Sequence, residues 1–326
     1  MSQRIAVIGA GRMARVRAHA LLATGQATIC GVASRTLESA QRFGQEIGCQ
    51  ACYDRYERLL DASADAVLIE IPHQPQDAAT FWALEHDLHV LVGGCLASTS
   101  QAAQRIADMA RSKALVVEAG YASRYGALWR RVQEMLQRGE LGRLIAVRSI
   151  ALWAGDPNTW YYSQALSGGM PLTHMTYGYI NLLRWVLGDP LCVSAVANRV
   201  RHTAPDLVEQ ETCLANLVFA DDVIASMMAS FCRPGDLEGW SVLFLGTEGL
   251  AKVDSDRSLL EIDRDGERIV LDYSASADPF VLQAQAFCAA LNGQDTCLNT
   301  PTDCLGDVRV AEAIARSCQS HETIWL

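Results

Sequence analysis

The sequence is poor in lysine and has no long apolar run. Its 27 basic residues include only two lysines, Lys113 and Lys252, and its 37 acidic residues give a formal net charge of −10. A nucleic-acid-binding domain usually shows a basic surplus, so no nucleic-acid partner is expected. No segment reaches the ~18 consecutive apolar residues of a membrane span. The short apolar run after Met1 does not resemble a signal peptide, and we expect a cytoplasmic protein without membrane association.

The eleven cysteines lack the spacing of a metal site. There is no repeated CxxC pair and no combination of Cys and His at zinc-ligand spacing, so no metal is expected. Cys49 and Cys52 form a single CxxC, and no thioredoxin-like pattern surrounds it. We therefore expect reduced thiols in a cytoplasmic compartment, with a redox motif as the weaker alternative.

What the sequence does contain is ample material for a core. Of 326 residues, 50% are hydrophobic and 20% are charged, which excludes wholesale disorder. At about 150 residues per domain the length predicts two domains. We expect a domain over 1–120, a second over 121–305, and a final helix over 306–326 that packs back on the first domain.

The first 120 residues alternate short β-branched runs with amphipathic segments. This alternation predicts a doubly wound parallel sheet of the Rossmann type, an α/β fold. The expected strands are Arg4–Ile8, Ala27–Ala33, Ala66–Ile71, His89–Val92 and Leu115–Glu118. The expected helices are Met13–Ala23, Thr36–Ile47, Arg55–Leu60, Asp77–Glu85 and Ser98–Ser112.

After Tyr121 the pattern changes to longer strands joined by tight turns, which predicts an open, mainly antiparallel sheet in an α+β domain. The expected strands are Leu144–Leu152, Cys192–Arg199, Glu211–Phe219, Val223–Phe231, Ser241–Leu245, Ala251–Asp254, Leu259–Asp263 and Arg268–Tyr273. The expected helices are Gly126–Gln137, Leu172–Leu187, Pro279–Leu291 and Leu305–Ser317.

A glycine-rich motif follows the first strand and opens the first helix. Gly9 permits a tight turn, Gly11 lets the backbone approach a pyrophosphate, and Ala14 allows close helix–strand packing. The helix N-terminus at Arg12 and Met13 then offers free N–H groups to phosphates. A glycine-rich turn that binds nothing is the alternative.

The end of the second strand bears on the choice between NAD and NADP. An NAD site usually has Asp or Glu there, but this chain has Ser34, Arg35 and Thr36. Arg35 can pair bidentately with a 2′-phosphate, and the two hydroxyls can donate to it. The pattern favours NADP; if Arg35 instead stacks on adenine, the site would accept either cofactor.

Several motifs resemble the glucose–fructose oxidoreductase, inositol dehydrogenase and MocA (Gfo/Idh/MocA) family over nearly the whole chain. They are the opening Val7–Ala14, then Asp65–Ile69 with Pro72, His89–Leu91, Gly139–Gly142, Gly168-Gly169, Leu182–Pro190 and Gly246–Gly249. The resemblance implies an NAD(P)-dependent oxidoreductase and a homodimer or homotetramer formed through the second domain's sheet. It also implies that Ile71, Pro72, His73, Gly93 and Gly94 line the cofactor.

The chain departs from that family at the catalytic motifs. Family members usually carry Glu-Lys-Pro where this chain has Gly93, Gly94 and Cys95. Their Asp-x-x-x-His-x-x-Asp motif is replaced by His174, Gly178 and Asn181, and a Pro-Asn-x-x-His pattern becomes Pro72–Gln76. Neither lysine lies where it could replace the missing amine.

Other residues must therefore exchange the proton that accompanies hydride transfer. His174 is the main catalytic candidate because its ordinary pKa suits acid–base work, although it could be a core histidine. Tyr177, one turn further, could donate a proton or only pack. Cys95 could be a reactive thiol or an inert small residue, and His73 could contact cofactor or substrate or be a loop residue.

The candidate substrate residues are mostly aromatic. Tyr121 follows the last strand of the first domain, and Trp153, Trp160 and Tyr161, with Tyr162, precede Gly168-Gly169. Beside a cleft they would form a pocket for an apolar or planar small molecule; otherwise they are core. Arg124 could hold an anionic substrate or form a structural salt bridge.

The resulting hypothesis is an NADP-dependent reductase of an imine or carbonyl group in a small substrate, with a specialised metabolite as one candidate. An iminium substrate brings its own proton, which would suit a site without lysine. The alternatives are a catalytically silent NADP-binding sensor or partner protein, and a non-redox lyase or cyclase that retains the cofactor.

Overall fold

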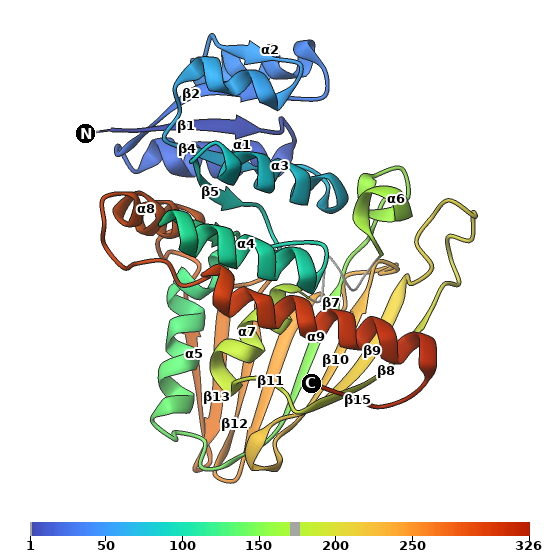
Figure 1. Ribbon diagram of the computed structural model, residues 1–326. Coiled ribbons are helices and arrows are strands. Elements are labelled where there is room, and N and C mark those ends of the chain that lie inside the picture. Colours follow the sequence, from blue (N-terminus) through green and yellow to red (C-terminus); the bar gives the residue numbers. More distant parts are fainter. Residues whose placement is uncertain (1, 170–176) are drawn as a thin grey trace. The chain divides into compact units, whose positions relative to one another are not determined.

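The computed structural model describes residues 2–169 and 177–326 (Figure 1). The chain divides into two compact units. The first comprises Met1–Tyr125 and Ala277–Leu305, and the second comprises Gly126–Ser276 and Gly306–Leu326.

The first unit is built on a six-stranded parallel sheet, as the alternating pattern predicted. The strand order is β3-β2-β1-β4-β5-β6, with every neighbouring pair parallel. The strands are β1 (Gln3–Ile8), β2 (Ala27–Ala33), β3 (Cys52–Tyr53), β4 (Ala66–Ile69), β5 (His89–Val92) and β6 (Val117–Ala119). The order reverses at β1, so the carboxyl edge beside β1 and β4 is where a doubly wound sheet binds ligands.

The helices of this unit begin at residues whose side chains suit helix starts. Thr36 and Thr99 each accept a hydrogen bond from the backbone N–H three residues on, at Ser39 and Ala102. The helices are α1 (Arg12–Ala23), α2 (Leu37–Ile47), η1 (Tyr56–Ala62), α3 (His73–Glu85), α4 (Ser100–Lys113), η2 (Ala122–Tyr125) and α8 (Pro279–Leu291).

The core of the first unit includes α8, although α8 comes late in the chain. Phe287 and Cys288 are fully buried in one cluster with Ile5, Val7 and Leu21. Residues 277–305, which were expected within the second domain over 121–305, therefore belong to the first unit, because the apolar face of α8 is buried against α1.

The second unit contains a nine-stranded sheet in the order β14-β13-β12-β11-β7-β10-β9-β8-β15. Its neighbouring strands pair antiparallel except β7 and β10, which are parallel. The strands are β7 (Leu144–Leu152), β8 (Cys192–Asn198), β9 (Thr212–Val218), β10 (Ile224–Ser230), β11 (Trp240–Gly246), β12 (Gly249–Asp254), β13 (Leu259–Arg264), β14 (Glu267–Asp272) and β15 (Ile324–Trp325). This confirms the expected open, mainly antiparallel sheet; β15 was not foreseen.

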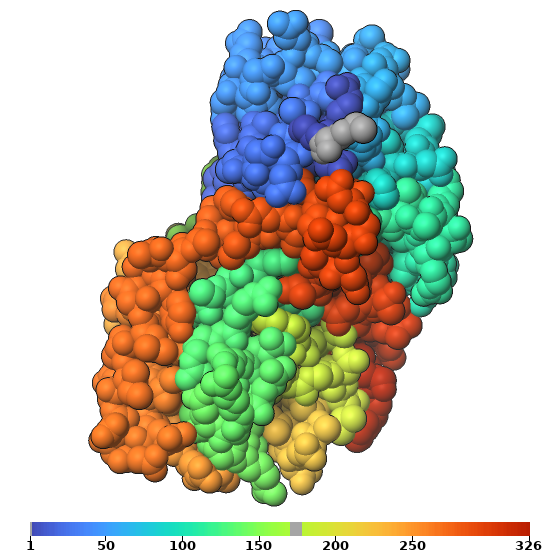
Figure 2. Space-filling view, turned by 90° about the vertical axis from the view of Figure 1, so that its left-hand side faces the viewer, coloured from blue at the N-terminus to red at the C-terminus, as the bar shows by residue number. Residues whose placement is uncertain are grey.

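In Figure 1, α5 (Ala127–Gln137), α7 (Tyr177–Leu187) and the long C-terminal helix α9 (Pro301–Ser320) lie over the same face of this sheet. Figure 2 shows α5 in green beside the orange strands that end the sheet. Arg264 on β13 donates to the backbone carbonyl of Glu140 at 2.9 Å, which ties the strand to the turn after α5. The short η3 (Trp160–Tyr162), α6 (Gln164–Ser167) and η5 (Ala220–Asp222) complete the unit.

The last helix is held within the second unit by a buried carboxylate. Asp307 is fully buried, accepts from Asn181 at 2.8 Å, and pairs with Arg184 at 2.5 Å. Residues 306–326 therefore belong to the second unit. Among the described helices, none is long and apolar enough to cross a membrane.

Candidate cofactor and catalytic site

The loop between β1 and α1 is shaped to receive a phosphate group. Gly9 has φ of +117°, and a Cβ there would lie 2.1 Å from the backbone carbonyl oxygen of Glu70. A Cβ at Gly11 would meet nothing within 4 Å among the described residues. The space in front of Gly11 and the N–H groups of Arg12 and Met13 at the start of α1 fit a dinucleotide pyrophosphate.

The three residues after β2 have different roles. Thr36 is the N-cap of α2, and its hydroxyl accepts from Ser39 N–H and donates to the Ser39 hydroxyl. The expectation that Thr36 would donate to a phosphate therefore competes with a capping role. Arg35 is exposed, and no described acidic residue pairs with it, while Ser34 is half-buried. Arg35 is thus the group most available to a ribose 2′-phosphate.

His73 is a helix residue and not a loop residue. The strand β4 ends at Ile69, two residues earlier than expected, and Ile71 and Pro72 connect it to α3, which begins at His73. The helix begins four residues before the expected Asp77, and Pro75 lies in its first turn, where proline is tolerated. The His73 side chain is 5% exposed, and burial lowers its pKa to about 4.

Gly93 and Gly94 end β5 beside this connection. Gly93 N–H donates to the Ile69 carbonyl at 2.7 Å, and Gly94 accepts from Gly120 N–H at 3.0 Å. These bonds continue the sheet past the ends of β5 and β6. Cys95 follows and is buried, with its carbonyl bound by the Gln76 side chain at 2.9 Å.

A buried arginine on α1 joins the carboxyl ends of two strands, and sequence reasoning missed it. The Arg17 guanidinium pairs with Glu70 at 2.5 Å and donates to Gln283 at 2.7 Å and to the Gly120 carbonyl. It also lies over the Phe280 ring. Burial raises the pKa of Glu70, and the nearby Arg17 charge opposes that rise.

A second missed carboxylate is buried in the same unit. Glu118 on β6 accepts from Tyr125 and, at 3.2 Å, from Gln283. Burial raises the pKa of Glu118, while hydrogen bonds from Tyr125 and Gln283 oppose the rise. Such residues are hard to find from sequence because nothing in the local pattern separates a buried polar side chain from an exposed one.

Two of the expected site residues beside this network have structural contacts. Tyr121 is buried, and its carbonyl accepts from Asn299 at 3.0 Å. Arg124 pairs with Asp303 at 2.5 Å and donates to the Leu298 carbonyl at 3.1 Å. For Arg124 these bonds support the structural alternative over substrate binding.

The two lysines belong to different units. Lys113, the last residue of α4, donates to Asp87 at 2.7 Å and to the Glu85 carbonyl at 3.1 Å. Lys252 is exposed on β12 in the second unit. Among the described residues of the first unit, no lysine therefore takes the place of the family lysine at Gly94.

The cysteine expectations also fit the structure. No disulfide joins the eleven cysteines, all of which lie in described parts of the chain. Burial raises the pKa of both Cys49 and Cys52. A reactive thiol needs a lowered pKa, so the redox alternative for this CxxC is disfavoured.

In the second unit the expected aromatic residues pack on one another. The Trp153 ring meets Tyr161 edge-on at 5.1 Å, and Trp160 lies 4.2 Å from Tyr161 between ring centroids. Fully buried Phe231, which sequence reasoning missed, contacts Trp153 at 5.1 Å. Trp153, Trp160 and Tyr161 remain half-buried, so part of each surface is accessible.

The expected catalytic pair cannot be placed. His174 lies outside the described residues, and of Tyr177 only its position as the first residue of α7 is described. One turn along α7, Asn181 is buried and bound to Asp307, which gives it a structural role.

A hydrogen-bonded cluster near these aromatics contains potential metal ligands. One ligand atom each of His202, Glu211 and Cys232 lies within 4.8 Å of the others. However, Glu211 Oε2 already accepts from the backbone N–H groups of Arg201 and His202, and Oε1 pairs with His202 Nδ1. We interpret the cluster as a structural one, in which Glu211 holds the connection over residues 199–211 through its hydrogen bonds.

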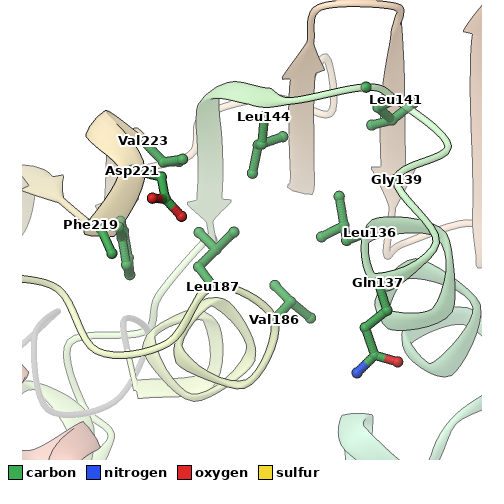
Figure 3. Close-up of a pocket in the computed structure, with 12 residues that line it drawn as sticks. Leu136, Gln137, Gly139, Leu141, Leu144, Val186, Leu187, Phe219, Asp221 and Val223 are labelled. Atoms are coloured by element: carbon green, nitrogen blue, oxygen red, sulfur yellow. The ribbon is translucent and has the colours of Figure 1, made fainter.

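A pocket of about 240 Å³ lies within the second unit, apart from these residues (Figure 3). Leu136 on α5, Val186 and Leu187 on α7, and Leu144 on β7 point into it (Figure 3). Its lining is largely aliphatic, and it offers no proton-exchanging side chain except Asp221.

The loop at Gly9 and Gly11 can receive a phosphate group, and it lies where the strand order of the doubly wound sheet reverses. These features define a dinucleotide-binding protein with a second, α+β unit. Residues 3–121 match the model for the oxidoreductase family with an NAD-binding Rossmann fold, and residues 129–252 match the GFO/IDH/MocA C-terminal domain. The chain belongs to the GFO/IDH/MocA family, whose members are NAD(P)-dependent oxidoreductases.

Individual relatives share part of their length with this chain. A dTDP-3,4-didehydro-2,6-dideoxy-alpha-D-glucose 3-reductase from Streptomyces antibioticus is 34% identical over 61% of this chain and 61% of its own. The enzyme of the same name from Saccharopolyspora spinosa is 28% identical over 63% of this chain and 62% of its own. The chain thus matches about three fifths of each relative.

The fold itself is shared over the full length. An oxidoreductase from Agrobacterium radiobacter, solved with NAD⁺, L-tartaric acid and magnesium, superposes with a TM-score of 0.88 at 17% identity, covering 100% of this chain and 98% of the other.

Proposed function

We propose that this protein is an NADP-dependent reductase of a carbonyl or imine group in a small substrate. The observation that carries the proposal is the open phosphate loop at Gly9 and Gly11 together with the exposed, unpaired Arg35 among the described residues. Relatives named as reductases of a keto-sugar nucleotide support a carbonyl substrate over an imine.

The residues have separate tasks in this proposal. The backbone N–H groups at the start of α1 hold the pyrophosphate, and Arg35 pairs with the 2′-phosphate. When bound, the dinucleotide supplies hydride transfer. The half-buried rings of Trp153, Trp160 and Tyr161 would pack against the substrate. His174, the proton donor expected from the sequence, lies outside the described residues.

The cofactor proposal is tested by fluorescence titration of NADPH and NADH. We expect Arg35→Ala to weaken NADPH binding by about tenfold or more, because a charge-assisted bidentate pair is lost, and to leave NADH binding nearly unchanged. The matched control is Thr36→Ala, which removes a helix cap worth about 1 kcal/mol and lowers stability without changing the NADPH preference. An equal loss for both cofactors would show that Arg35 stacks on adenine instead.

Reductase activity is tested by following NADPH absorbance with ketone and imine panels. Turnover supports the proposal. Tight NADPH binding without any turnover would favour a cofactor-binding sensor or a non-redox enzyme, and failure to bind either cofactor would refute the proposed function.

We also propose that the protein forms a homodimer or homotetramer through the outer face of the nine-stranded sheet. Apolar side chains are exposed there on adjacent strands, including Val196, Leu214 and Ile224 at 46–54% exposure. Leu214 is opposite Val196 on β8 and Met228 on β10, so these residues form a continuous row. A row of this kind is typical of an interface.

A further inference from the structure

Gly93 and Gly94 directly follow β5, and each lies next to a polar side chain from the segment that follows β4. A Cβ built at Gly93 would lie 2.2 Å from the Glu70 carboxyl carbon. A Cβ built at Gly94 would lie 3.7 Å from His73 Nε2. The Glu70 carboxylate therefore occupies the space that a side chain at Gly93 would need, and the His73 ring adjoins the place where a side chain at Gly94 would begin.

These two side chains lie at the ligand-binding edge of the sheet. Glu70 is the residue whose carbonyl approaches Gly9 of the phosphate loop, so the β4–α3 segment borders that loop. In open α/β sheets the ligand lies outside the carboxyl ends of the strands, at the point where the strand order reverses. His73 is three residues beyond Glu70 and thus borders the proposed cofactor position.

His73 is well fixed for a role at this edge. It is the first residue of α3, directly after Pro72, and its ring is buried. The neighbouring acidic groups have other partners, since Glu70 pairs with Arg17 and Asp77 accepts from Ser98. Burial is the cause of its lowered pKa, so the ring is neutral at pH 7.

We propose that His73 exchanges the proton with the substrate in this site, at the position that the absence of a lysine leaves open. This rests on the proposed reductase function. For each carbonyl reduced, one hydride and one proton form a C–H and an O–H bond as the C=O π bond breaks. In alcohol oxidation the neutral ring accepts the proton at Nε2, becomes an imidazolium and releases the proton to water. Carbonyl reduction is the reverse: the ring takes a proton from water, and the imidazolium donates it from Nε2 to the developing alkoxide.

The first test compares His73→Asn with His19→Asn, a matched change at an exposed histidine on α1. The probes are 1,2-cyclohexanedione, a ketone, and 3,4-dihydroisoquinoline, an imine that binds as its iminium and carries its own proton. We expect His73→Asn to lower ketone turnover by 100-fold or more and iminium turnover by less than tenfold. We expect His19→Asn to change neither. Equal losses for the two probes, or no loss, would overturn the proposal.

The second test needs no turnover. In protein labelled with ¹³C-histidine, the His73 ring signal is the one that disappears in His73→Asn. We expect saturating NADP⁺ and NADPH to move the His73 signal to two different positions, because the nicotinamide ring of NADP⁺ carries a positive charge and that of NADPH does not. We expect both cofactors to leave the His19 signal in place. Cofactor binding that leaves the His73 signal unmoved would refute the assignment. If neither cofactor binds, the result would instead refute the proposed NADP-dependent function, on which the proposal for His73 rests.

Discussion

The space beside Gly93 allows a quantitative prediction. Gly93 does not have a positive φ, so alanine is compatible with its backbone and only the surroundings exclude a side chain. A Cβ there would lie 2.2–2.4 Å from three atoms of the Glu70 carboxylate. Gly93→Ala must therefore displace that carboxylate from Arg17.

Breaking a buried ion pair by losing one partner costs about 3–5 kcal/mol. We expect Gly93→Ala to destabilise the protein by about 3 kcal/mol, since the displaced carboxylate retains part of its hydration. For a domain of about 150 residues this lowers the melting temperature by roughly 6–12 °C. The control is Gly11→Ala, where a Cβ would meet nothing within 4 Å, and which should leave the melting temperature of the cofactor-free protein unchanged.

A double-mutant cycle in urea then separates a steric clash from a general loss of packing. Glu70→Ala should cost about 3 kcal/mol because Arg17 loses its partner. With the carboxylate removed, adding Gly93→Ala should cost almost nothing more. The two changes are thus expected to be non-additive by about 3 kcal/mol. Additivity within about 0.5 kcal/mol would refute the assignment of that space to Glu70.

Two further predictions concern the second unit. Leu214→Lys should convert the proposed oligomer to a monomer of 35.5 kDa in light scattering, whereas Leu237→Lys, at an equally apolar but fully exposed loop position, should not; an unchanged mass for Leu214→Lys contradicts the sheet interface. Although burial raises the pKa of Glu211, hydrogen bonds from Cys232, His202 and backbone N–H groups bring it below its usual 4.5. Its stabilisation is therefore complete above pH 4.5 and is lost as the pH falls below that value. Glu211→Gln should therefore lower the free energy of unfolding at neutral pH and leave it nearly unchanged in acid, so that stability depends less on pH than in the parent protein. Identical pH profiles of stability for the two proteins would exclude this role.

The sequence predicted the fold well because both sheets have strong local signals. Strands such as β1 and β2 are β-branched runs bounded by turn residues, and the glycine loop follows β1 in the expected context. The place of α8 in the first unit could not be predicted, because its membership of that core depends on contacts between residues far apart in the sequence, such as Phe287 and Ile5.

The site was harder to predict because its polar residues act across strands. Glu70 was expected inside the strand Ala66–Ile71, and the alternative for His73 was a loop residue. In each case the local pattern was compatible with several environments. The side chain's neighbour, a glycine on the next strand, was the deciding feature, and a single sequence does not show which residues face each other across a sheet.

The glycine pair and the two polar side chains form one interdependent arrangement. A side chain at Gly93 excludes the Glu70 carboxylate, and without that carboxylate Arg17 loses its ion pair between α1 and the end of β4. At Gly94 the φ of +72° disfavours a side chain even though the distance to His73 would allow one. Restoring a lysine there would therefore strain the backbone and place a second proton-exchanging group against the His73 ring. A chain with glycines at both positions thus needs its acid–base group on the neighbouring segment, which is where His73 lies.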